Sequence, residues 1–593
     1  MSENRPPLPD GHTLEHDFYS ECWKRFRRDL ERAAFVRLDD VGGEEVWEGV
    51  VPVFWEDPVT SEEQVAPHRI RIVVTSSFPF QKPTVIPADQ APPIHSSRHQ
   101  APGSPPGALC LWTDQGGWQP WTSADDILAR IHAWFVHYHR NDWAPQDQPP
   151  DLHLYFPARA PRPMMLIGNE WLSLNDGVTG RFGVWQKNPV QAFAGNITAG
   201  VGTPRLRHDD RALAQLSLKD RDHDQAGVWF RLLSEPRPQL TLDKLLTEID
   251  DKTGKNSGWS LQQLQALFGQ KQRGSSPLQI VMALGYPSGS ESLSWLFVRA
   301  EVPFEKKGRR WTDRRVLQQA RIESFETASI SPDALMRRVR HTAPLLQGCR
   351  VLVFGQGAIG SSVTLLLAKS GVQHLRVVDS DRLRPGNAVR HSAGIPWSGW
   401  AKTEASAGIA QSHAPDCKIR CEEASWDRER LTAWVQEAQV VVDATAHPAF
   451  SLLLNDICIR TCRPAIYVTT HRRASVGRIR VVDPGRDACQ LCYEGGYLYS
   501  EEYPLIAPMD EGAFFEDGCG VPSIEASAVD IEATANWATR SALSLLQSRS
   551  LPGNHCLIIH DPLPGGRRPL DEVGIHWSMW KPLPRCEACS RST

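Results

Sequence analysis

The chain has 593 residues, of which 41% are hydrophobic and 45 are prolines, and its formal net charge is −4 at pH 7. This length predicts roughly two to four domains. The near-neutral charge argues against a general binder of nucleic acid, and no run of about 18 apolar residues would span a membrane. The first residues, MSENRPPLPDGHTLEHD, lack the apolar core of a signal peptide, so we expect a cytoplasmic protein. The 13 cysteines then indicate catalytic, metal-binding or buried thiols instead of disulfides.

The first part of the chain, residues 1–145, has the pattern of an α+β domain. Phe18–Phe35 carries apolar residues at helical spacing, and a second helix is predicted over Ala124–Tyr138. Trp47–Trp55 and His68–Thr75 have the patterns of strands. The proline-rich stretch from Ser76 to Pro87 predicts no regular structure.

Cys110 stands in a loop before the second predicted helix. One interpretation is a buried structural thiol, because free cysteines are commonly buried. The order of the surrounding motifs favours a catalytic interpretation instead. These motifs are a Phe-Pro-Phe-x-x-Pro segment, a Cys-Leu pair and a Trp-x-Pro segment, made by Phe78, Pro79, Phe80, Pro83, Cys110, Leu111, Trp118 and Pro120.

In this order the motifs resemble the ubiquitin-conjugating E2 enzymes, and the resemblance covers most of residues 15–143. It implies that Cys110 receives a ubiquitin-like protein as a thioester. The His-Pro-Asn motif of that family is absent, and His95, followed by Ser96 and Ser97, lies in its neighbourhood. Because the family's Asn supports the oxyanion, we expect His95 or a backbone amide to stabilise that charge here.

A proline-rich, polar stretch over residues 146–163 predicts a semi-rigid linker. The following region, residues 164–330, alternates short strand-like pieces with a helix predicted near Ser260–Phe268. No motif in it indicates chemistry. We therefore expect a scaffold between two active domains.

The C-terminal part, residues 331–593, opens with a predicted nucleotide site. Val351–Phe354 is a short apolar run, typical of a strand buried on both faces of a parallel sheet. Gly355, Gly357 and Gly360 follow at GxGxxG spacing and lead into a predicted helix. Such glycines allow a tight turn and close approach of a ligand, and the helix N-terminus offers N–H groups to phosphate.

A second predicted strand, Leu375–Val378, ends at Asp379, where a carboxylate can accept hydrogen bonds from ribose hydroxyls. Asp381, Asn387 and Arg390 follow, and Lys402 stands shortly downstream. The pattern resembles the D-x-D…N-x-x-R-Q signature of E1-type activating enzymes, the ThiF and MoeB superfamily.

The chemistry of adenylation explains these residue types. Bringing a carboxylate to ATP places two anions together, so Arg390 and Lys402 would neutralise the phosphates. The resemblance implies that Asp379 and Asp381 lie on the nucleotide side, that Asn387 bonds near the phosphates, and that the enzyme forms a homodimer through this domain. An NAD-binding domain needs none of Asn387, Arg390 or Lys402.

Val440–Asp443 is another predicted buried strand. Members of the superfamily usually carry Asp-x-x-Asp-Asn from the strand end, and the second Asp binds Mg²⁺. This chain has Ala446 and His447 at the last two of these positions, which leaves Asp443 as the candidate ligand.

Two CxxC pairs, Cys489 with Cys492 and Cys586 with Cys589, supply four thiolates for a structural Zn²⁺ site. A redox-active CxxC is the alternative, but a thioredoxin-like context is missing. Cys519 lies between the pairs in a glycine-flanked loop and resembles the nucleophile of atypical E1 enzymes. There a thiolate would capture the adenylate as a thioester; the alternative is an incidental loop thiol.

The order of domains resembles the bacterial E2–E1 fusion proteins of antiphage CBASS operons. That resemblance implies an N-terminal E2-like α+β domain, a middle region and a C-terminal Rossmann-like α/β adenylation domain that uses ATP, Mg²⁺ and Zn²⁺. It further implies a thioester relay from Cys519 to Cys110, and conjugation of a protein carboxyl terminus, on a cGAS-like nucleotidyltransferase or a ubiquitin-like protein, to a target amine. A ThiF/MoeB-type sulfur-carrier activating enzyme and a non-catalytic nucleotide-sensing scaffold remain as alternatives.

Overall fold

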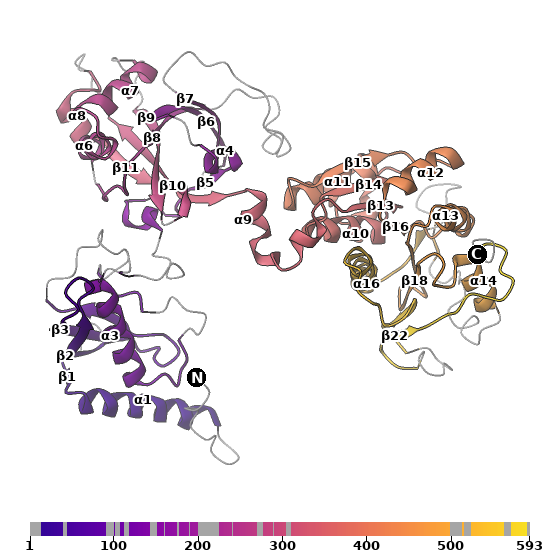
Figure 1. Cartoon of the computed structure of the whole chain (residues 1–593), viewed down its shortest axis with the longest axis horizontal. Helices are drawn as coiled ribbons and strands as arrows, with labels where there is room; N and C mark the ends of the chain where they lie inside the picture. The colour runs from indigo at the N-terminus through magenta and orange to yellow at the C-terminus, as the bar shows by residue number, and fades with distance from the viewer. Residues whose placement is uncertain are drawn as a thin grey trace. The chain divides into compact units, whose positions relative to one another are not determined.

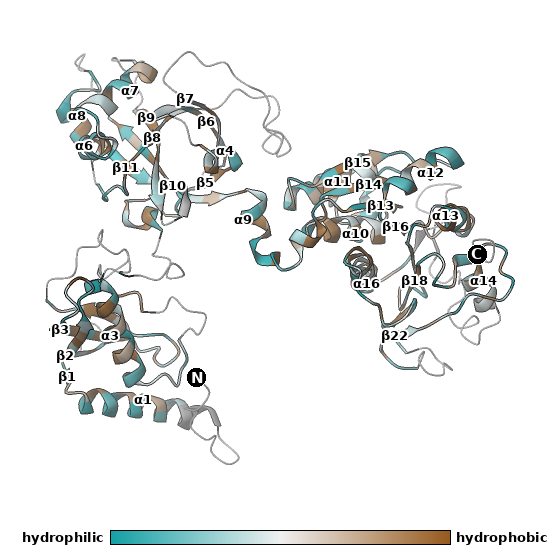
Figure 2. Ribbon diagram, viewed as in Figure 1, coloured by the Kyte–Doolittle hydropathy of each residue, from teal (hydrophilic) through white to brown (hydrophobic). Residues whose placement is uncertain are grey.

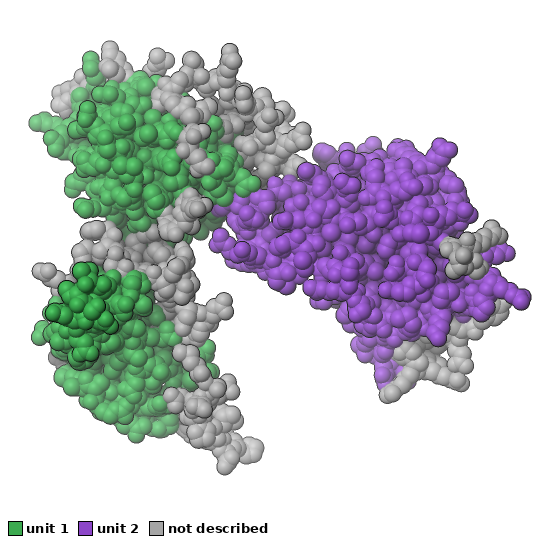
Figure 3. Space-filling view, viewed as in Figure 1, with its two compact units in different colours: residues 1–208, 222–328 green, residues 209–221, 329–593 purple. Residues whose placement is uncertain are grey.

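The structure is a computed structural model of the whole chain. It describes residues 14–38, 44–89, 100, 107–111, 118–140, 142, 151–158, 160–174, 177–188, 190–199, 225–239, 241–269, 277–288, 290–303, 310–498, 513–514, 523–562 and 571–589. The chain divides into two compact units, residues 1–208 with 222–328 and residues 209–221 with 329–593 (Figure 3). Each unit is described by itself below.

The N-terminal part of the first unit has a four-stranded antiparallel sheet in the order β1-β2-β3-β4. Two long helices, α1 and α3, accompany the sheet (Figure 1). The element bounds are α1 Leu14–Arg32, β1 Val36–Arg37, β2 Glu45–Glu56, β3 Glu63–Val74, β4 Thr84–Pro87 and α3 Ala124–Arg140.

One face of this sheet is buried against both helices. Side chains alternate along β2, so that Trp47 and Val53 are buried whereas Phe54 is exposed. The buried face packs on Phe26 of α1 and Ile131 of α3. The four residues of β4 are a correction, because the proline-rich stretch that contains them was expected to be irregular. Its prolines lie at the strand end or outside the strand, where no hydrogen bond of the ladder is lost.

The rest of the first unit is built on an eight-stranded sheet in the order β11-β10-β9-β8-β6-β7-β5-β12. Its strands are β5 Met164–Ile167, β6 Thr179–Asn188, β7 Gln191–Ala199, β8 Gln225–Arg231, β9 Leu278–Ser288, β10 Ser290–Val302, β11 Arg321–Ser324 and β12 Glu326–Ser329. Its helices are η1 Leu152–Tyr155, α4 Asn169–Leu172, α6 Leu242–Thr253, α7 Trp259–Phe268 and α8 Arg314–Gln319.

Two apolar cores flank this sheet. One contains α6, α7 and α8, which lie to one side of the strands (Figure 1). The other is centred on Trp171, Phe182 and Phe297. Leu152 and Phe156 are buried in the first core, so part of the stretch predicted as a linker over 146–163 is packed into this region.

The second unit is built on another eight-stranded sheet, in the order β15-β14-β13-β16-β17-β18-β21-β22. The first five strands in this order run parallel, and β18, β21 and β22 continue antiparallel. The bounds are β13 Arg350–Phe354, β14 His374–Val378, β15 Lys418–Glu422, β16 Val440–Asp443, β17 Ala465–His471, β18 Val476–Val482, β21 His555–Ile559 and β22 Gly574–Ser578.

Helices cover both faces of this sheet, as a doubly wound fold requires. Residues of α10 and α16 are buried on one face, and residues of α12, α13 and α14 on the other. In Figure 2, α13 and α16 are largely brown and α12 is largely teal. The helices of this unit are α9 Pro332–Met336, η3 Arg337–Val339, η4 Ala343–Leu346, α10 Ala358–Lys369, η5 Pro385–Asn387, η6 Ile395–Trp397, α11 Lys402–His413, α12 Arg428–Glu437, α13 Pro448–Arg460, α14 Gln490–Leu498 and α16 Ala528–Leu546.

The strand order reverses at β13, whose neighbours are β14 on one side and β16 on the other. Loops that leave the carboxyl ends of such strands diverge, and the crevice between them is where ligands bind in open α/β sheets. A two-stranded pair, β19 Ala513–Phe514 with β20 Ser523–Ile524, completes the described elements of this unit. Among the described residues, no helix is long and apolar enough to cross a membrane.

Candidate active site

The glycine turn after β13 leaves open space at the N-terminus of α10. Gly355 has φ +79°, and a Cβ on it would lie 2.8 Å from the backbone of Ala444. A Cβ on Gly360 would overlap the carbonyl oxygen of Gly355. Gly357, in contrast, would meet nothing within 4 Å. The first and third glycines are therefore required by packing, and the second faces space that a phosphate group would fit.

Asp379 and His391 hold this turn in place. The Oδ2 atom of Asp379 accepts a hydrogen bond from the Gln356 N–H at 2.6 Å. The Ala393 N–H donates to His391 Nδ1 at 3.0 Å, so the ring proton lies on Nε2. That Nε2 in turn donates to the Gln356 carbonyl at 2.9 Å. Burial lowers the pKa of His391, in agreement with a neutral ring. No role could be predicted for His391 from the sequence, because its effect depends on a contact with Gln356.

The predicted signature residues are brought together around the same turn. Lys402 Nζ lies 2.8 Å from Asp381 Oδ2, and the Lys402 N–H donates to the Asp381 carbonyl. Asn387 accepts a hydrogen bond from the Arg384 N–H at 3.1 Å through its side chain. Its carbonyl accepts bonds from the N–H groups of Arg390 and His391. Half-buried Arg390 directly precedes His391, which bonds to the Gln356 carbonyl in the glycine turn.

Asp443 has a different environment from the one expected of a Mg²⁺ ligand. Its side chain is only 2% exposed. Oδ1 accepts hydrogen bonds from the N–H and hydroxyl of Thr445, and Oδ2 accepts one from Ser451 Oγ at 2.5 Å. Burial raises the pKa of this carboxyl. In this arrangement Asp443 joins the end of β16 to the loop and helix that follow it.

The two cysteine pairs meet in a single cluster. The ligand atoms of Cys489, Cys492, Cys586 and Cys589 all lie within 4.8 Å of one another. The sulfur atoms of Cys489 and Cys492 are 3.7 Å apart, and Cys489 with Cys586 and Cys492 with Cys589 are each 3.6 Å apart. Four thiolates around zinc at about 2.3 Å would be separated by about 3.8 Å, so the cluster has the size of a tetrahedral site. The Leu583 N–H also donates to Cys492 Sγ at 3.3 Å.

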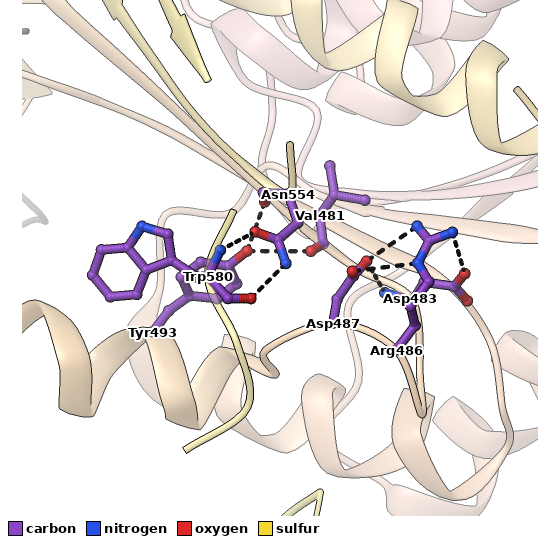
Figure 4. Close-up of polar contacts among 7 residues, drawn as sticks. All are labelled: Val481, Asp483, Arg486, Asp487, Tyr493, Asn554 and Trp580. Atoms are coloured by element: carbon purple, nitrogen blue, oxygen red, sulfur yellow. Dashed lines mark hydrogen bonds and ion pairs between the residues drawn. The ribbon is translucent and has the colours of Figure 1, made fainter. Parts of the chain in front are cut away.

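A clamp beside the cluster holds the C-terminal segment that carries the second pair (Figure 4). The Asn554 amide donates to the Trp580 carbonyl and accepts from the Trp580 N–H, both at 2.8 Å. Tyr493, next to Cys492, donates its hydroxyl to the Asn554 carbonyl at 2.6 Å. The segment is therefore fixed by neutral hydrogen bonds six residues before Cys586.

Cys110 lies between Leu109 and Leu111, which are both buried in the core of the N-terminal domain. The thiol is half-buried, and burial raises its pKa, whereas the charge of Lys82 acts in the opposite direction. Trp118 donates to the Pro79 carbonyl at 2.6 Å and so connects two of the motifs around this cysteine. Cys519 and His95 lie outside the described residues.

The C-terminal unit matches a known family. Residues 340–518 match the model of the ThiF family, a range that includes the glycine turn and the signature residues around it. This region is a ThiF/MoeB-type, E1-like adenylation domain.

Similar proteins span different parts of the chain. The protein y4oA of Sinorhizobium fredii is 24% identical over 564 residues, which is 88% of each chain. The adenylyltransferase and sulfurtransferase uba4 of Pyricularia oryzae is 24% identical over 223 residues, 37% of this chain and 40% of its own length. Among solved structures, MccB of E. coli with ATP is 20% identical, with a TM-score of 0.33 over 42% of this chain and 68% of that one.

Proposed function

We propose that the protein adenylates the C-terminal carboxylate of a protein substrate with ATP, and then passes the acyl group through two cysteine thioesters to a target amine. The observation that supports the first step is the open space at the glycine turn. The segment that carries Asp381, Asn387, Arg390 and Lys402 lies in the same ThiF match as this turn.

In the adenylation step, Arg390 and Lys402 stabilise the charge that develops on the phosphates, and the amides at the start of α10 bind them. Asp379 and His391 keep the turn in this conformation. ATP would be converted to the acyl adenylate and pyrophosphate, and Mg²⁺, when bound with ATP, would neutralise phosphate charge. We assign Asp443 an indirect role, since Thr445 and Ser451 occupy both of its carboxylate oxygens.

The four clustered cysteines would hold a structural Zn²⁺, which ties the C-terminal segment to α14. This assignment is supported by the sulfur spacing and by the N–H bond to Cys492.

The relay itself assigns Cys519 as the first acceptor of the acyl group and Cys110 as the second. In each step a thiolate attacks the activated carbonyl carbon, and AMP or the first thiolate leaves. In residues 1–145, helices pack on one face of a four-stranded antiparallel sheet, and Cys110 precedes the last of these helices. This arrangement supports an E2-like role. The carboxyl terminus of a cGAS-like nucleotidyltransferase or of a ubiquitin-like protein is the substrate to test.

A second candidate function is activation of a sulfur carrier, favoured by the similarity to adenylyltransferases that are also sulfurtransferases. It requires the same adenylation step but no thioester on Cys110. Incubation with ATP and a candidate substrate, followed by non-reducing gels, separates the two functions.

Because the acyl group passes from Cys519 to Cys110, the relay predicts that Cys519→Ala loses both thioesters and that Cys110→Ala loses only the second. Cys462→Ala, a change of an exposed cysteine outside both sites, should keep both. Unchanged bands in Cys110→Ala would leave the sulfur-carrier function. For the adenylation step, Arg390→Ala should lower ATP–pyrophosphate exchange by about 100-fold. Undiminished exchange would remove Arg390 from the site.

A further inference from the structure

A basic cavity lies at the edge of the C-terminal sheet where its first three parallel strands begin. The cavity has a volume of about 450 Å³. Trp434, Glu437 and Ala438 of α12 form one wall. We call it the basic cavity after five of its lining residues, which are Arg350, His374, Arg376, Lys418 and Arg420.

This cavity is separate from the nucleotide site. β13 begins at Arg350, in the cavity, and ends at Phe354, immediately before Gly355 of the glycine turn. Five residues of parallel strand span about 16 Å. Since β14 and β15 run parallel to β13, their first residues lie at the same edge as Arg350. Binding at this cavity is therefore independent of nucleotide binding at the glycine turn.

The strand register places the basic side chains in a grid. Arg350, His374 and Lys418 are paired across three adjacent strands. Arg376 and Arg420 form a second pair, two residues further along. Paired residues, and residues two apart, point to the same face of a sheet. The grid spacing is thus about 4.8 Å across the strands and about 6.6 Å along them.

The positive charge of the grid is only partly neutralised. Glu437 is the acidic residue of the lining, and it pairs with Arg376 at 3.0 Å and with Arg420 at 3.5 Å. Glu422, further along β15, also pairs with Arg376 at 3.6 Å. Within the described residues, neither Arg350 nor Lys418 has an ion pair within 4.0 Å. Both are exposed. The cavity consequently presents an excess of positive charge to an incoming ligand.

We propose that the basic cavity binds an acidic segment of another protein in an extended conformation. Alternate side chains of an extended peptide are about 6.6 Å apart, which matches the spacing from Lys418 to Arg420 along β15. β15 is also the edge of the described sheet, where an extended chain can pair with the free backbone groups. Basic residues on that edge repel a second copy of the same strand and attract an acidic one.

The test uses the full-length protein and a fluorescent peptide in which glutamate alternates with threonine. Fluorescence anisotropy should show binding that weakens as NaCl rises from about 50 to about 300 mM. Lys418→Glu should weaken it by about tenfold, because one attraction becomes a repulsion. The matched control is Arg549→Glu, an equal charge reversal at an exposed residue after α16, which should leave binding unchanged.

Three results would overturn the proposal. The first is equal binding of the peptide by wild type and Lys418→Glu. The second is equal binding of a peptide of the same composition with its glutamates in one block, and the third is full competition by tripolyphosphate at equal charge concentration. Either of the last two would indicate a non-specific anion site. ATP–pyrophosphate exchange should be the same in Lys418→Glu and wild type, so a failure of the peptide test is distinguishable from a failure of the adenylation proposal.

Discussion

Two sheets of this chain each contain eight described strands, but they differ in strand direction. In the middle region most neighbouring strands are antiparallel, as in the hairpins β6–β7 and β9–β10. In the C-terminal unit five adjacent strands run parallel, and their order reverses at β13. Only the second arrangement collects loops from separate strands at one edge. The direction of the strands, more than the size of the sheet or its apolar core, thus decides where a nucleotide site can form.

Two buried polar residues of the middle region find their partners within the fold. In the middle region Asp250 accepts hydrogen bonds from the N–H groups of Gly258 and Ser260, and Trp295 donates to the Trp171 carbonyl. These contacts are complete within the fold. Beside the glycine turn of the C-terminal unit, in contrast, Gly357 faces open space.

The largest expected effect is on the cysteine cluster, which is found in the C-terminal unit and has no counterpart among the described residues of the middle region. Structural zinc sites contribute about 10 kcal/mol or more of apparent folding energy. Cys489→Ser should therefore lose one equivalent of zinc per chain and unfold the C-terminal unit at temperatures where wild type is folded. Zinc content and thermal unfolding measure this, with Cys462→Ser as the control. Full stability of zinc-free Cys489→Ser would contradict a structural metal.

A second comparison uses one glycine from each region, Gly360 in α10 and Gly227 in β8. A Cβ at Gly360 would overlap the Gly355 carbonyl, and a Cβ at Gly227 would overlap the Phe182 ring. Gly360→Ala and Gly227→Ala should each lower the free energy of unfolding by about 1–3 kcal/mol. Only Gly360→Ala should also reduce ATP–pyrophosphate exchange, because it moves the turn. If folded Gly227→Ala loses at least as much ATP–pyrophosphate exchange as Gly360→Ala, the assignment of the nucleotide site to the C-terminal unit alone is wrong.

A third comparison uses one buried aspartate from each region, Asp443 at 2% exposure and Asp250 at 3%. In both Asp→Asn variants an amide N–H₂ replaces an oxygen that accepts a hydrogen bond, which should cost about 1–3 kcal/mol of unfolding free energy. Exchange activity should fall in Asp443→Asn and stay unchanged in Asp250→Asn. A loss of activity in Asp443→Asn without loss of stability would return Asp443 to the role of a Mg²⁺ ligand.

The last expected effect concerns the pH dependence of stability. Burial, with the nearby charges of Arg478 and Arg480, lowers the pKa of His471 to about 3. In the unfolded chain a histidine has a pKa of about 6.5, so below that pH the unfolded state binds a proton that folded His471 does not bind. The free energy of unfolding therefore falls as the pH drops below about 6.5. Between pH 7 and pH 5 the C-terminal unit should lose about 2 kcal/mol through this residue. In chemical denaturation, the free energy of unfolding of His471→Gln should change less between pH 7 and pH 5 than that of wild type. An equal change in the two proteins would contradict this prediction.

Local pattern was sufficient to predict much of the C-terminal sheet. Val351–Phe354 and Val440–Asp443 are short apolar runs, and both are buried strands in the structure. The glycines and the cysteine pairs were evident for the same reason, since their spacing is itself the signal. The middle region was predicted only as separate strand-like pieces, because pairing between distant strands leaves no local trace.

What could not be predicted depends on contacts between distant residues. His391 becomes important through Gln356, and the bonds around Asp443 depend on where Ser451 falls on α13. The basic cavity arises only when three strands from separate segments are placed in register. Each of its residues alone has the appearance of an ordinary exposed charge.

The cysteine cluster also makes a closed loop of the chain between Cys492 and Cys586, with its base fixed at both ends. The entropy of closing a long loop grows slowly with length, by about 0.6 kcal/mol for each doubling. Extra residues between α14 and α16 would therefore cost the domain little. The length of the chain between these two helices can therefore vary while the eight-stranded sheet stays the same.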